Sequence, residues 1–265
     1  MEKIRVVVSG MGKMGKEILA AVCNDPGLEP VGVLEKFSAE EYLSLPDGSG
    51  LVHLDKEPQA LLSRARPDVV VDFSNAEWTP HVVKAALEAN ARLVIGTTGL
   101  SSDLLKDLES SCREKQLGAV VASNFAIGAV LMMHLARIAG KYFDNAEIIE
   151  LHHDQKADAP SGTSIATAQA MVAARGRPFE LPPTKKEMVA GTRGGNIDGV
   201  SIHSVRLPGL VAHQEVIFGG KGQTLAIRHD STGRDSFMPG ILLAIKEVMN
   251  RSEMVRGLDA LIGLV

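Results

Sequence analysis

The sequence predicts an α/β protein in which a doubly wound parallel sheet is followed by a second α+β domain built on a mixed sheet. Apolar, β-branched runs alternate with helical segments through the first half of the chain. A glycine-rich turn follows the first of these runs directly. The second half instead carries several strand-like runs in succession around one long helical segment, as is typical of an α+β domain.

The first strand is expected over residues 4–9, a β-branched run of the kind found in buried parallel strands. A turn with three glycines follows it, ahead of a helix expected over residues 16–23. Its first glycine permits a tight turn, its second lets a pyrophosphate approach the backbone, and its third lets the helix pack closely on the strand. The spacing predicts a Rossmann-type dinucleotide-binding turn formed by Gly10, Met11, Gly12, Lys13, Met14 and Gly15.

A second strand, expected over residues 30–34, ends at an acidic residue that is followed by a basic one. The carboxylate of Glu35 is placed to accept hydrogen bonds from an adenosine ribose, which favours NADH. The ammonium of Lys36 is able to hold the 2′-phosphate of NADPH. The pair therefore predicts a nicotinamide cofactor and leaves NADH and NADPH both open.

Three further strands complete the parallel sheet, at residues 68–73, 92–95 and 118–122, with helices expected over 77–90 and 101–116. Because ligands bind beyond the carboxyl ends of such strands, the turns that follow them are expected to lie along one crevice. Taken singly, each turn is also explained as an ordinary strand-to-helix connection. Trp78 and Phe73 are expected in the core or in the crevice wall.

The second domain is expected to begin with an apolar helix over residues 126–141. A strand over 146–152 and a helix after Thr163 follow, and the polar, glycine-rich stretch 185–199 is either a mobile loop or an intersubunit arm. Three further strands are expected over 200–206, 210–218 and 223–228, and a final helix over 234–250. His203, His213 and His229 lie in these strands and are expected to be structural imidazoles.

Chemically active side chains gather where the strand at 146–152 ends. His152 and His153 are followed by Lys156, and the next turn opens a helix whose first amides attract a carboxylate or phosphate. Adjacent strand residues point to opposite faces, so we expect the chain to leave the sheet at the two histidines. The segment predicts a pocket for a small anion that undergoes proton transfer.

Composition excludes several other classes of function. The formal charge of −4 and the aromatic content of 4% argue against nucleic-acid binding. Cys23 and Cys112 are isolated, with no metal-ligand spacing, and are expected to be reduced thiols of a cytoplasmic protein. No metal site is predicted. No apolar run approaches the roughly 18 residues of a membrane span, and the chain enters its first strand without a signal peptide.

Four motifs together resemble one family, that of 4-hydroxy-tetrahydrodipicolinate reductase, also called dihydrodipicolinate reductase. They are Glu-Leu-His-His-Asp-Gln-Lys-Ala-Asp-Ala-Pro-Ser-Gly-Thr at 150–163, Gly-Thr-Thr-Gly at 96–99, Ala-Ser-Asn-Phe at 122–125 and Val-Arg-Leu-Pro-Gly-Leu-Val-Ala-His-Gln-Glu at 205–215. The resemblance extends over nearly the whole chain. Two departures concern the cofactor: Glu35-Lys36 replaces a frequent Glu-Arg pair, and the glycine turn is one residue shorter than Gly-x-x-Gly-x-Met-Gly, which is expected to shift the phosphate contacts.

The resemblance implies reduction of a cyclic imine with two carboxylates, formed by loss of water from 4-hydroxy-tetrahydrodipicolinate, in lysine and diaminopimelate synthesis. It implies that His152 is the general acid or base, and that Lys156 is a second proton donor or an electrostatic stabiliser. Substrate contacts are then expected at His153, Ser161, Gly162 and Thr163, and cofactor contacts at Gly96, Thr97, Thr98, Ala122, Ser123, Asn124 and Phe125.

The resemblance also implies the domain organisation and the assembly. Residues 1–126 are expected to form the dinucleotide-binding domain, to which residues 236–265 return, and residues 127–235 the substrate-binding and oligomerisation domain. A homotetramer is expected. Two rival hypotheses remain: another two-domain nicotinamide dehydrogenase, acting on a hydroxy or aldehyde substrate, and a non-catalytic redox sensor that binds the dinucleotide and an effector.

Overall fold

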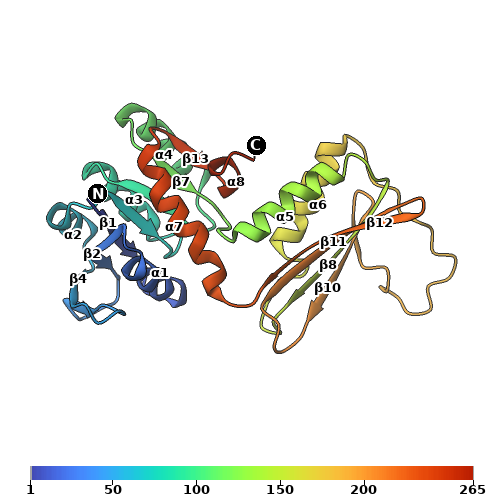
Figure 1. Cartoon of the computed structure of the whole chain (residues 1–265), viewed down its shortest axis with the longest axis horizontal. Helices are drawn as coiled ribbons and strands as arrows, with labels where there is room; N and C mark the ends of the chain where they lie inside the picture. The colour runs from blue at the N-terminus through green and yellow to red at the C-terminus, as the bar shows by residue number, and fades with distance from the viewer. Residues whose placement is uncertain (1, 265) are drawn as a thin grey trace. The chain divides into compact units, whose positions relative to one another are not determined.

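The computed structural model describes residues 2–264, which divide into two compact units (Figure 1). Unit 1 contains the described residues up to Ile127 and those from Phe237 onward, and unit 2 spans Gly128–Ser236. These limits lie within one residue of those expected from the sequence. Each unit is built on its own sheet.

Unit 1 contains an eight-stranded sheet in the order β13-β7-β6-β5-β1-β2-β4-β3. All neighbours pair in parallel except β3, which runs antiparallel to β4. The strand order reverses beside β1, and this reversal is the position where doubly wound sheets bind ligands. The predicted fold class is confirmed for this unit. The strands are β1 Ile4–Ser9, β2 Leu28–Leu34, β3 Tyr42–Ser44, β4 Leu51–Asp55, β5 Val69–Asp72, β6 Arg92–Ile95, β7 Ala119–Val121 and β13 Met254–Arg256.

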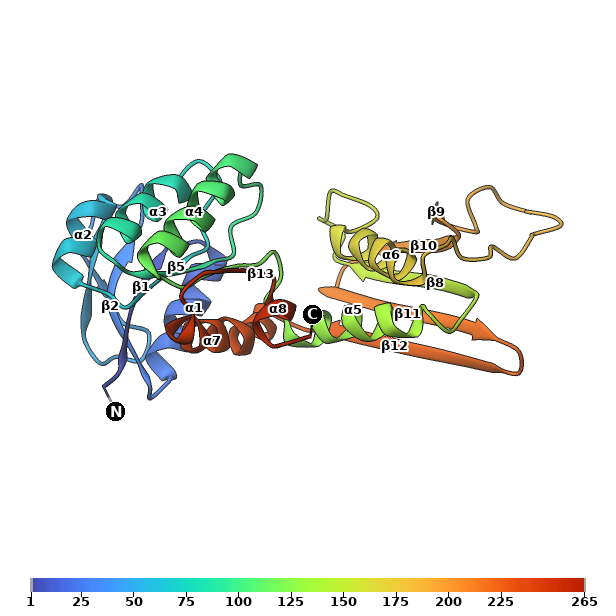
Figure 2. The ribbon, with the colours of Figure 1, turned by 90° about the horizontal axis from the view of Figure 1, so that it is seen from above.

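Helices cover both faces of this sheet, which explains why its central strands are apolar without alternation. Figure 2 shows α2, α3 and α4 along one face and α1 with α7 along the other. Val7 and Val70 are fully buried in the resulting core. The helices are α1 Lys13–Asn24, α2 Pro58–Ala65, α3 Thr79–Glu88, α4 Ser102–Lys115, α7 Met238–Glu247 and α8 Leu258–Leu261.

Several local predictions for unit 1 were wrong. The helix after the glycine turn begins at Lys13, three residues earlier than predicted. Sequence analysis missed β3, β4 and α2, because these elements are short and lie between polar segments. The single helix predicted over 234–250 consists of a 3-10 turn at Arg234–Phe237, then α7, then a 3-10 turn at Val248–Asn250. Proline in the first turn of α7 lacks the amide needed to continue a preceding helix.

Unit 2 contains a five-stranded mixed sheet in the order β12-β11-β8-β10-β9, in which only β8 and β10 pair in parallel. Buried residues of β8, β10 and β11 pack with α5 and α6 on one face of this sheet, among them Ile148 and Met171. The predicted second α+β domain on a mixed sheet is thus confirmed. Its elements are α5 Ile127–Ala139, β8 Asn145–His152, α6 Gly162–Arg175, β9 Gly195–Ile197, β10 Val200–Arg206, β11 Ala212–Gly220 and β12 Gln223–Ser231.

The glycine turn of unit 1 has the close contacts that its sequence predicts. Gly10 has a φ of +90°, a conformation that side chains rarely adopt. A Cβ on Gly15 would lie 1.6 Å from the carbonyl oxygen of Gly10, whereas a Cβ on Gly12 would meet nothing within 4 Å. Backbone packing therefore requires Gly15, while Gly12 leaves open space beside the turn.

Gly15→Ala is expected to lower the free energy of unfolding by about 2–4 kcal/mol, because the methyl group must displace backbone atoms. Gly12→Ala is the matched control and is expected to leave the unfolding midpoint nearly unchanged. Thermal unfolding of both variants followed by circular dichroism measures the difference. Equal midpoints for the two variants would contradict this assignment.

Candidate functional site

The carboxyl ends of β1 and β2 border a hollow that the glycine turn opens toward α1. Gly12 precedes the first residue of α1, and no side chain caps this helix. The Met11 amide donates a 2.7 Å hydrogen bond to Glu35 Oε2, so the acidic residue at the end of β2 holds the turn. The hollow is lined by Gly10, Met11, Gly12, Leu34, Glu35, Lys36, Phe37, Phe73, Ser74, Asn75 and Trp78. An uncapped helix start beside open backbone fits a pyrophosphate, and Glu35 fits a ribose.

Lys36 occupies the mouth of this hollow. Its Nζ lies 5.4 Å from the ring centroid of Phe37 and 5.9 Å from that of Trp78, within the range of cation–π attraction. Both rings and the lysine line the hollow. Trp78, expected in the core or crevice wall, lines the hollow and is largely buried.

A buried carboxylate that sequence analysis missed ties the next turns together. Asp72 at the end of β5 has no solvent exposure. It accepts hydrogen bonds from the hydroxyls of Ser74 at 2.7 Å, Thr79 at 2.6 Å and Thr97 at 2.9 Å. These bonds connect the ends of β5 and β6 and the start of α3.

Two residues predicted to contact the cofactor have side chains that are hydrogen-bonded or packed within the protein, and their cofactor contact stays a prediction. The hydroxyl of Thr97 is bonded to Asp72, and the ring of Phe125 is buried with its centroid 5.3 Å from that of Phe73. A Cβ on Gly96 would lie 2.2 Å from the Phe73 ring, so this glycine also serves close packing. The side chains of Thr98 and Ser123 are exposed and remain candidates for the cofactor, while Asn124 caps the Ala126 amide and Ala122 is buried.

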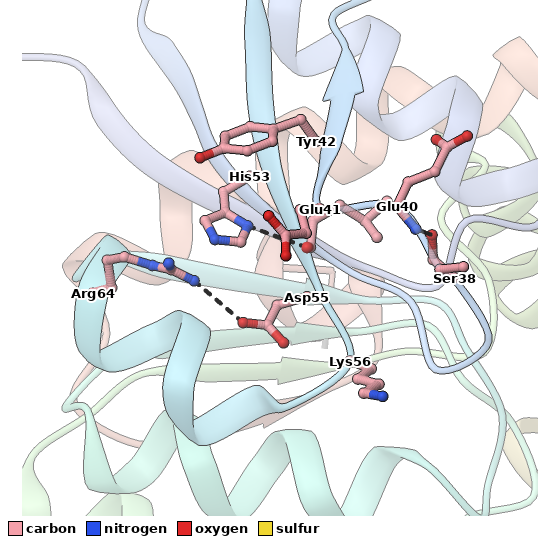
Figure 3. A pocket seen from close by; sticks show the side chains of 10 residues that line it. Ser38, Glu40, Glu41, Tyr42, His53, Asp55, Lys56 and Arg64 are labelled. Atoms are coloured by element: carbon pink, nitrogen blue, oxygen red, sulfur yellow. Dashed lines mark hydrogen bonds and ion pairs between the residues drawn. The ribbon is translucent and has the colours of Figure 1, made fainter.

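Another hollow lies at the far edge of the unit 1 sheet, between β4, α2 and the segment before β3 (Figure 3). Arg64 donates to Asp55 at 3.2 Å, and the rings of Tyr42 and His53 stack with centroids 5.1 Å apart. Its principal polar groups therefore satisfy one another, and no predicted site residue lies there.

In unit 2, the strand that carries the predicted anion pocket ends at His152, as expected. Ile148 and Glu150 are buried on the face of β8 that packs with the helices, and His152 continues that alternation. The Nδ1 atom of His152 is hydrogen-bonded to Glu150 Oε2. Glu150 is fully buried and also accepts bonds from the guanidinium of Arg206 at 2.9 and 2.7 Å.

These contacts determine the charges of Glu150 and His152. Burial alone would raise the pKa of Glu150, but hydrogen bonds from Arg206, Ser204 and His152 outweigh burial and lower that pKa. Burial lowers the pKa of His152, and the bond to Glu150 opposes burial only in part. The ligand-free ring is therefore favoured in its neutral form, with the Nδ1 proton donated to Glu150 and Nε2 left for a ligand.

The segment after β8 holds the other predicted donor. Lys156 Nζ donates to Asp158 Oδ1 at 2.6 Å, and the Lys156 amide donates to the His153 carbonyl at 3.2 Å. The His153 side chain is exposed. Arg206 also donates to the Asp158 carbonyl at 2.8 Å, so β10 holds this segment beside His152.

The residues at the start of α6 that are predicted to bind carboxylates form two groups. The Ser161 side chain is bonded within the protein, whereas Gly162 and Thr163 offer backbone amides. Ser161 Oγ accepts the Ser164 amide at 3.2 Å and contacts Ser164 Oγ at 2.8 Å, and Ser164 in turn donates to Gln214 at 2.7 Å. The buried Ser161 hydroxyl therefore caps the helix, and a substrate contact at Ser161 stays a prediction. Within the described residues, the amides of Gly162 and Thr163 have no protein acceptor, and open space surrounds Gly162.

Sequence analysis also missed Glu150 and Arg206 as site residues. A usable signal was present, because a carboxylate in the buried register of an apolar strand requires a partner. Arg206 stands in the motif at 205–215, yet only the strand pairing of His152 with Arg206 brings the two side chains together.

A hollow at a Rossmann-type glycine turn in one unit, and a strand that ends at His152 ahead of a helix start in the other, are features of a two-domain nicotinamide-dependent oxidoreductase. Family profiles described as the N-terminus and C-terminus of dihydrodipicolinate reductase match residues 4–125 and 128–262. The chain belongs to the dihydrodipicolinate reductase family, which confirms the resemblance seen in its motifs.

Relatives support this membership over their whole length. A 4-hydroxy-tetrahydrodipicolinate reductase of Dehalococcoides mccartyi is 46% identical over 265 residues, covering 100% of both chains. One of Syntrophomonas wolfei is 48% identical and covers 98% of this chain and 99% of its own. A dipicolinate-bound dihydrodipicolinate reductase of Paenisporosarcina sp. TG-14 superposes with a TM-score of 0.89 at 42% identity, covering 97% of this chain and 99% of that one.

More distant structures share the fold alone. An amine dehydrogenase of Mycobacterium smegmatis has a TM-score of 0.65 at 17% identity, covering 95% and 94% of the two chains. Among residues 2–264, no helix is long and apolar enough to cross a membrane, and no three His, Cys, Asp or Glu side chains are grouped as a metal site.

Proposed function

We propose that the chain reduces the dehydrated imine of 4-hydroxy-tetrahydrodipicolinate to tetrahydrodipicolinate, in lysine and diaminopimelate biosynthesis. The name of its full-length relatives supports this reaction. The observation that carries the proposal is the strip from His152 to Thr163, where an imidazole, an ammonium and two unpaired amides follow one another. The dipicolinate bound to the Paenisporosarcina reductase is a diacid of the same kind.

The protein must first bind two carboxylates. The amides of Gly162 and Thr163 lie at a helix start, where the helix dipole favours an anion. The exposed side chain of His153, in the segment between β8 and α6, adds a donor. Each charge-assisted hydrogen bond contributes roughly 1.5–3 kcal/mol, so a ligand with one carboxylate would bind distinctly more weakly.

The protein must then deliver a proton, while a bound reduced nicotinamide supplies the hydride. The carboxylates of the substrate raise the pKa of His152, which burial holds low in the free protein. The substrate thereby favours the imidazolium that protonates it through Nε2. Lys156 is the second proton donor or stabilises the charge that develops in the transition state.

The cofactor is NADH, NADPH or both, and the hollow at the glycine turn supports this range. Glu35 offers a carboxylate to ribose hydroxyls, and Lys36 offers a cation to a 2′-phosphate. Thr98 and Ser123 are the exposed side chains that remain for the nicotinamide half.

The test of the reaction is consumption of reduced nicotinamide in the presence of the dipicolinate-pathway substrate. Turnover with this substrate, and none with hydroxy acids, aldehydes or sugars, is the expected result. Turnover of a hydroxy or aldehyde substrate would favour another dehydrogenase. Dinucleotide binding with no turnover of any substrate would favour a redox sensor.

His152→Gln is expected to lower kcat about 10²- to 10⁴-fold with a small change in KM, because the imidazole acts in the transition state. Thr163→Val is expected mainly to raise KM, because it removes the hydroxyl proposed to bind a substrate carboxylate beside the Thr163 amide throughout the reaction. Steady-state kinetics of both variants separate the two roles. Equal effects on KM would refute the division.

Lys36→Ala is expected to raise KM for NADPH about tenfold while changing KM for NADH by less than about twofold, because only NADPH carries a phosphate for the ammonium. Lys56→Ala, on an exposed residue outside the hollow, is the control. An equal rise of KM for both cofactors would contradict the proposed contact.

We also propose a homotetramer assembled through unit 2. On the sheet face opposite α5 and α6, Ile149, Leu151, Val205 and Ile217 remain partly exposed. Helix α5 adds exposed Leu131, Leu135 and Ile138, spaced as one stripe, and the turn after it adds exposed Tyr142. Exposed apolar residues gathered in this way are typical of subunit interfaces. Met188 and Val189 are exposed in the segment at 185–199, which supports the intersubunit-arm alternative for it.

Sedimentation velocity is expected to give a mass of about four 28.2 kDa chains. Ile149→Lys combined with Leu151→Lys is expected to yield smaller species, because it buries charge in the interface. Lys substitutions at exposed Gln169 and Ala173 are the control. A monomeric native chain at micromolar concentration would contradict the assembly.

A cytoplasmic location is the last part of the proposal. Cys23 and Cys112 are free thiols, and burial raises the pKa of Cys112 to about 11. Such thiols stay protonated and suit a reducing compartment. Cell fractionation tests the location, and recovery from a secreted fraction would overturn it.

A further inference from the structure

We propose that Glu150 and Arg206 are positioning residues for the reaction, which hold His152 with Nε2 as the only nitrogen able to exchange a proton with substrate. This inference rests on the proposed role of His152. It adds a guanidinium and a carboxylate that act through the imidazole.

The first support is geometric. Arg206 is the cross-strand partner of His152 in the parallel pairing of β8 with β10. Its guanidinium meets both oxygens of Glu150, at 2.7 and 2.9 Å, and one of these oxygens also meets His152 Nδ1. A bidentate pair in a fully buried setting has little freedom to rotate, so the imidazole is held at a fixed angle.

The second support is chemical. An ionised carboxylate only accepts hydrogen bonds, so Nδ1 of His152 must carry a proton whether the ring is neutral or charged. The proton gained on ionisation is therefore the one at Nε2. The pair thus determines which nitrogen reacts, as well as where the ring lies.

Arg206 also reaches the second predicted donor. It donates to the carbonyl of Asp158 at 2.8 Å, and the carboxylate of Asp158 accepts from Lys156 at 2.6 Å. One guanidinium thereby connects the strand that carries His152 with the segment that carries Lys156. Loss of Arg206 is expected to affect both donors.

The charged groups that face the ring come from three places. Glu150 lies on β8, Lys156 in the following segment and Arg206 on β10, while β11 presents Ala212 at the paired position. Burial lowers the pKa of His152 and the two cations lower it further, whereas Glu150 raises it. Removing the Glu150 charge is therefore expected to lower the pKa of the ring.

The same strand supplies a matched control. Glu147 accepts hydrogen bonds from His203 at 2.8 Å and from Arg193 at 2.5 Å. The cluster therefore contains a carboxylate, an imidazole and a guanidinium, as does the cluster at Glu150. It lies an odd number of residues from Glu150, so it points to the other face of the sheet. A general effect of losing one carboxylate from β8 would appear in both positions.

The experiment compares Glu150→Gln, Glu150→Asp and Glu147→Gln with the native chain, by steady-state kinetics across pH. Glu150→Gln is expected to lower kcat about 10- to 100-fold with KM changed less than about threefold. The ionisation assigned to His152 moves to lower pH, because more acid is needed to protonate the ring. Glu150→Asp restores part of kcat, and Glu147→Gln leaves the profile unchanged.

An unshifted profile in Glu150→Gln, or the same shift in Glu147→Gln, overturns the inference. Nitrogen-resolved NMR of the His152 ring in the native chain provides a readout that needs no variant to fold and no turnover. A neutral ring protonated at Nδ1 is expected, and one protonated at Nε2 overturns the inference. A native chain that does not reduce the substrate overturns the proposed function instead, and the NMR result still decides this inference.

Discussion

The buried charge of Glu150 is the constraint on which the second unit depends. A carboxylate without solvent exposure is costly unless charge-assisted hydrogen bonds replace its hydration, and Arg206 provides two of them. The register of β8 with β10 must hold for these bonds to form. The same register holds His152 at the strand end and draws the Lys156 segment toward the sheet. Electrostatic pairing inside the sheet and the arrangement of the reactive groups are therefore one structural requirement.

The first unit satisfies a buried carboxylate in a different way. Asp72 is surrounded by the hydroxyls of Ser74, Thr79 and Thr97, without a cation. Neutral donors hold the strand ends together but add no charge close to a dinucleotide. Three short hydroxyl contacts also fix loops that would otherwise move independently. Each unit thus uses one acidic residue to organise loops.

The sequence was sufficient for the fold class, the glycine turn and the strip from His152 onward, because periodicity and local motifs specify them. The sequence was insufficient for features that depend on contacts between residues far apart in the chain. The strands β3 and β4 are too short for a periodic signal, and Ser161 caps α6 through a bond to Ser164 that spacing alone leaves ambiguous. Phe125 stands in a motif expected to contact the cofactor, but its ring is buried against Phe73. Arg206 is 56 residues from Glu150, so only strand register relates them.

The bond between the Met11 amide and Glu35 links the proposed ribose contact of Glu35 to the glycine turn. A phosphorylated ribose repels this carboxylate, and movement of Glu35 away from the phosphate would remove the acceptor of that amide. Binding NADPH instead of NADH would then disturb the glycine turn at the pyrophosphate. This turn is several bonds away from the 2′-phosphate that distinguishes the two cofactors. A substitution at position 35 consequently alters loop order as well as selectivity.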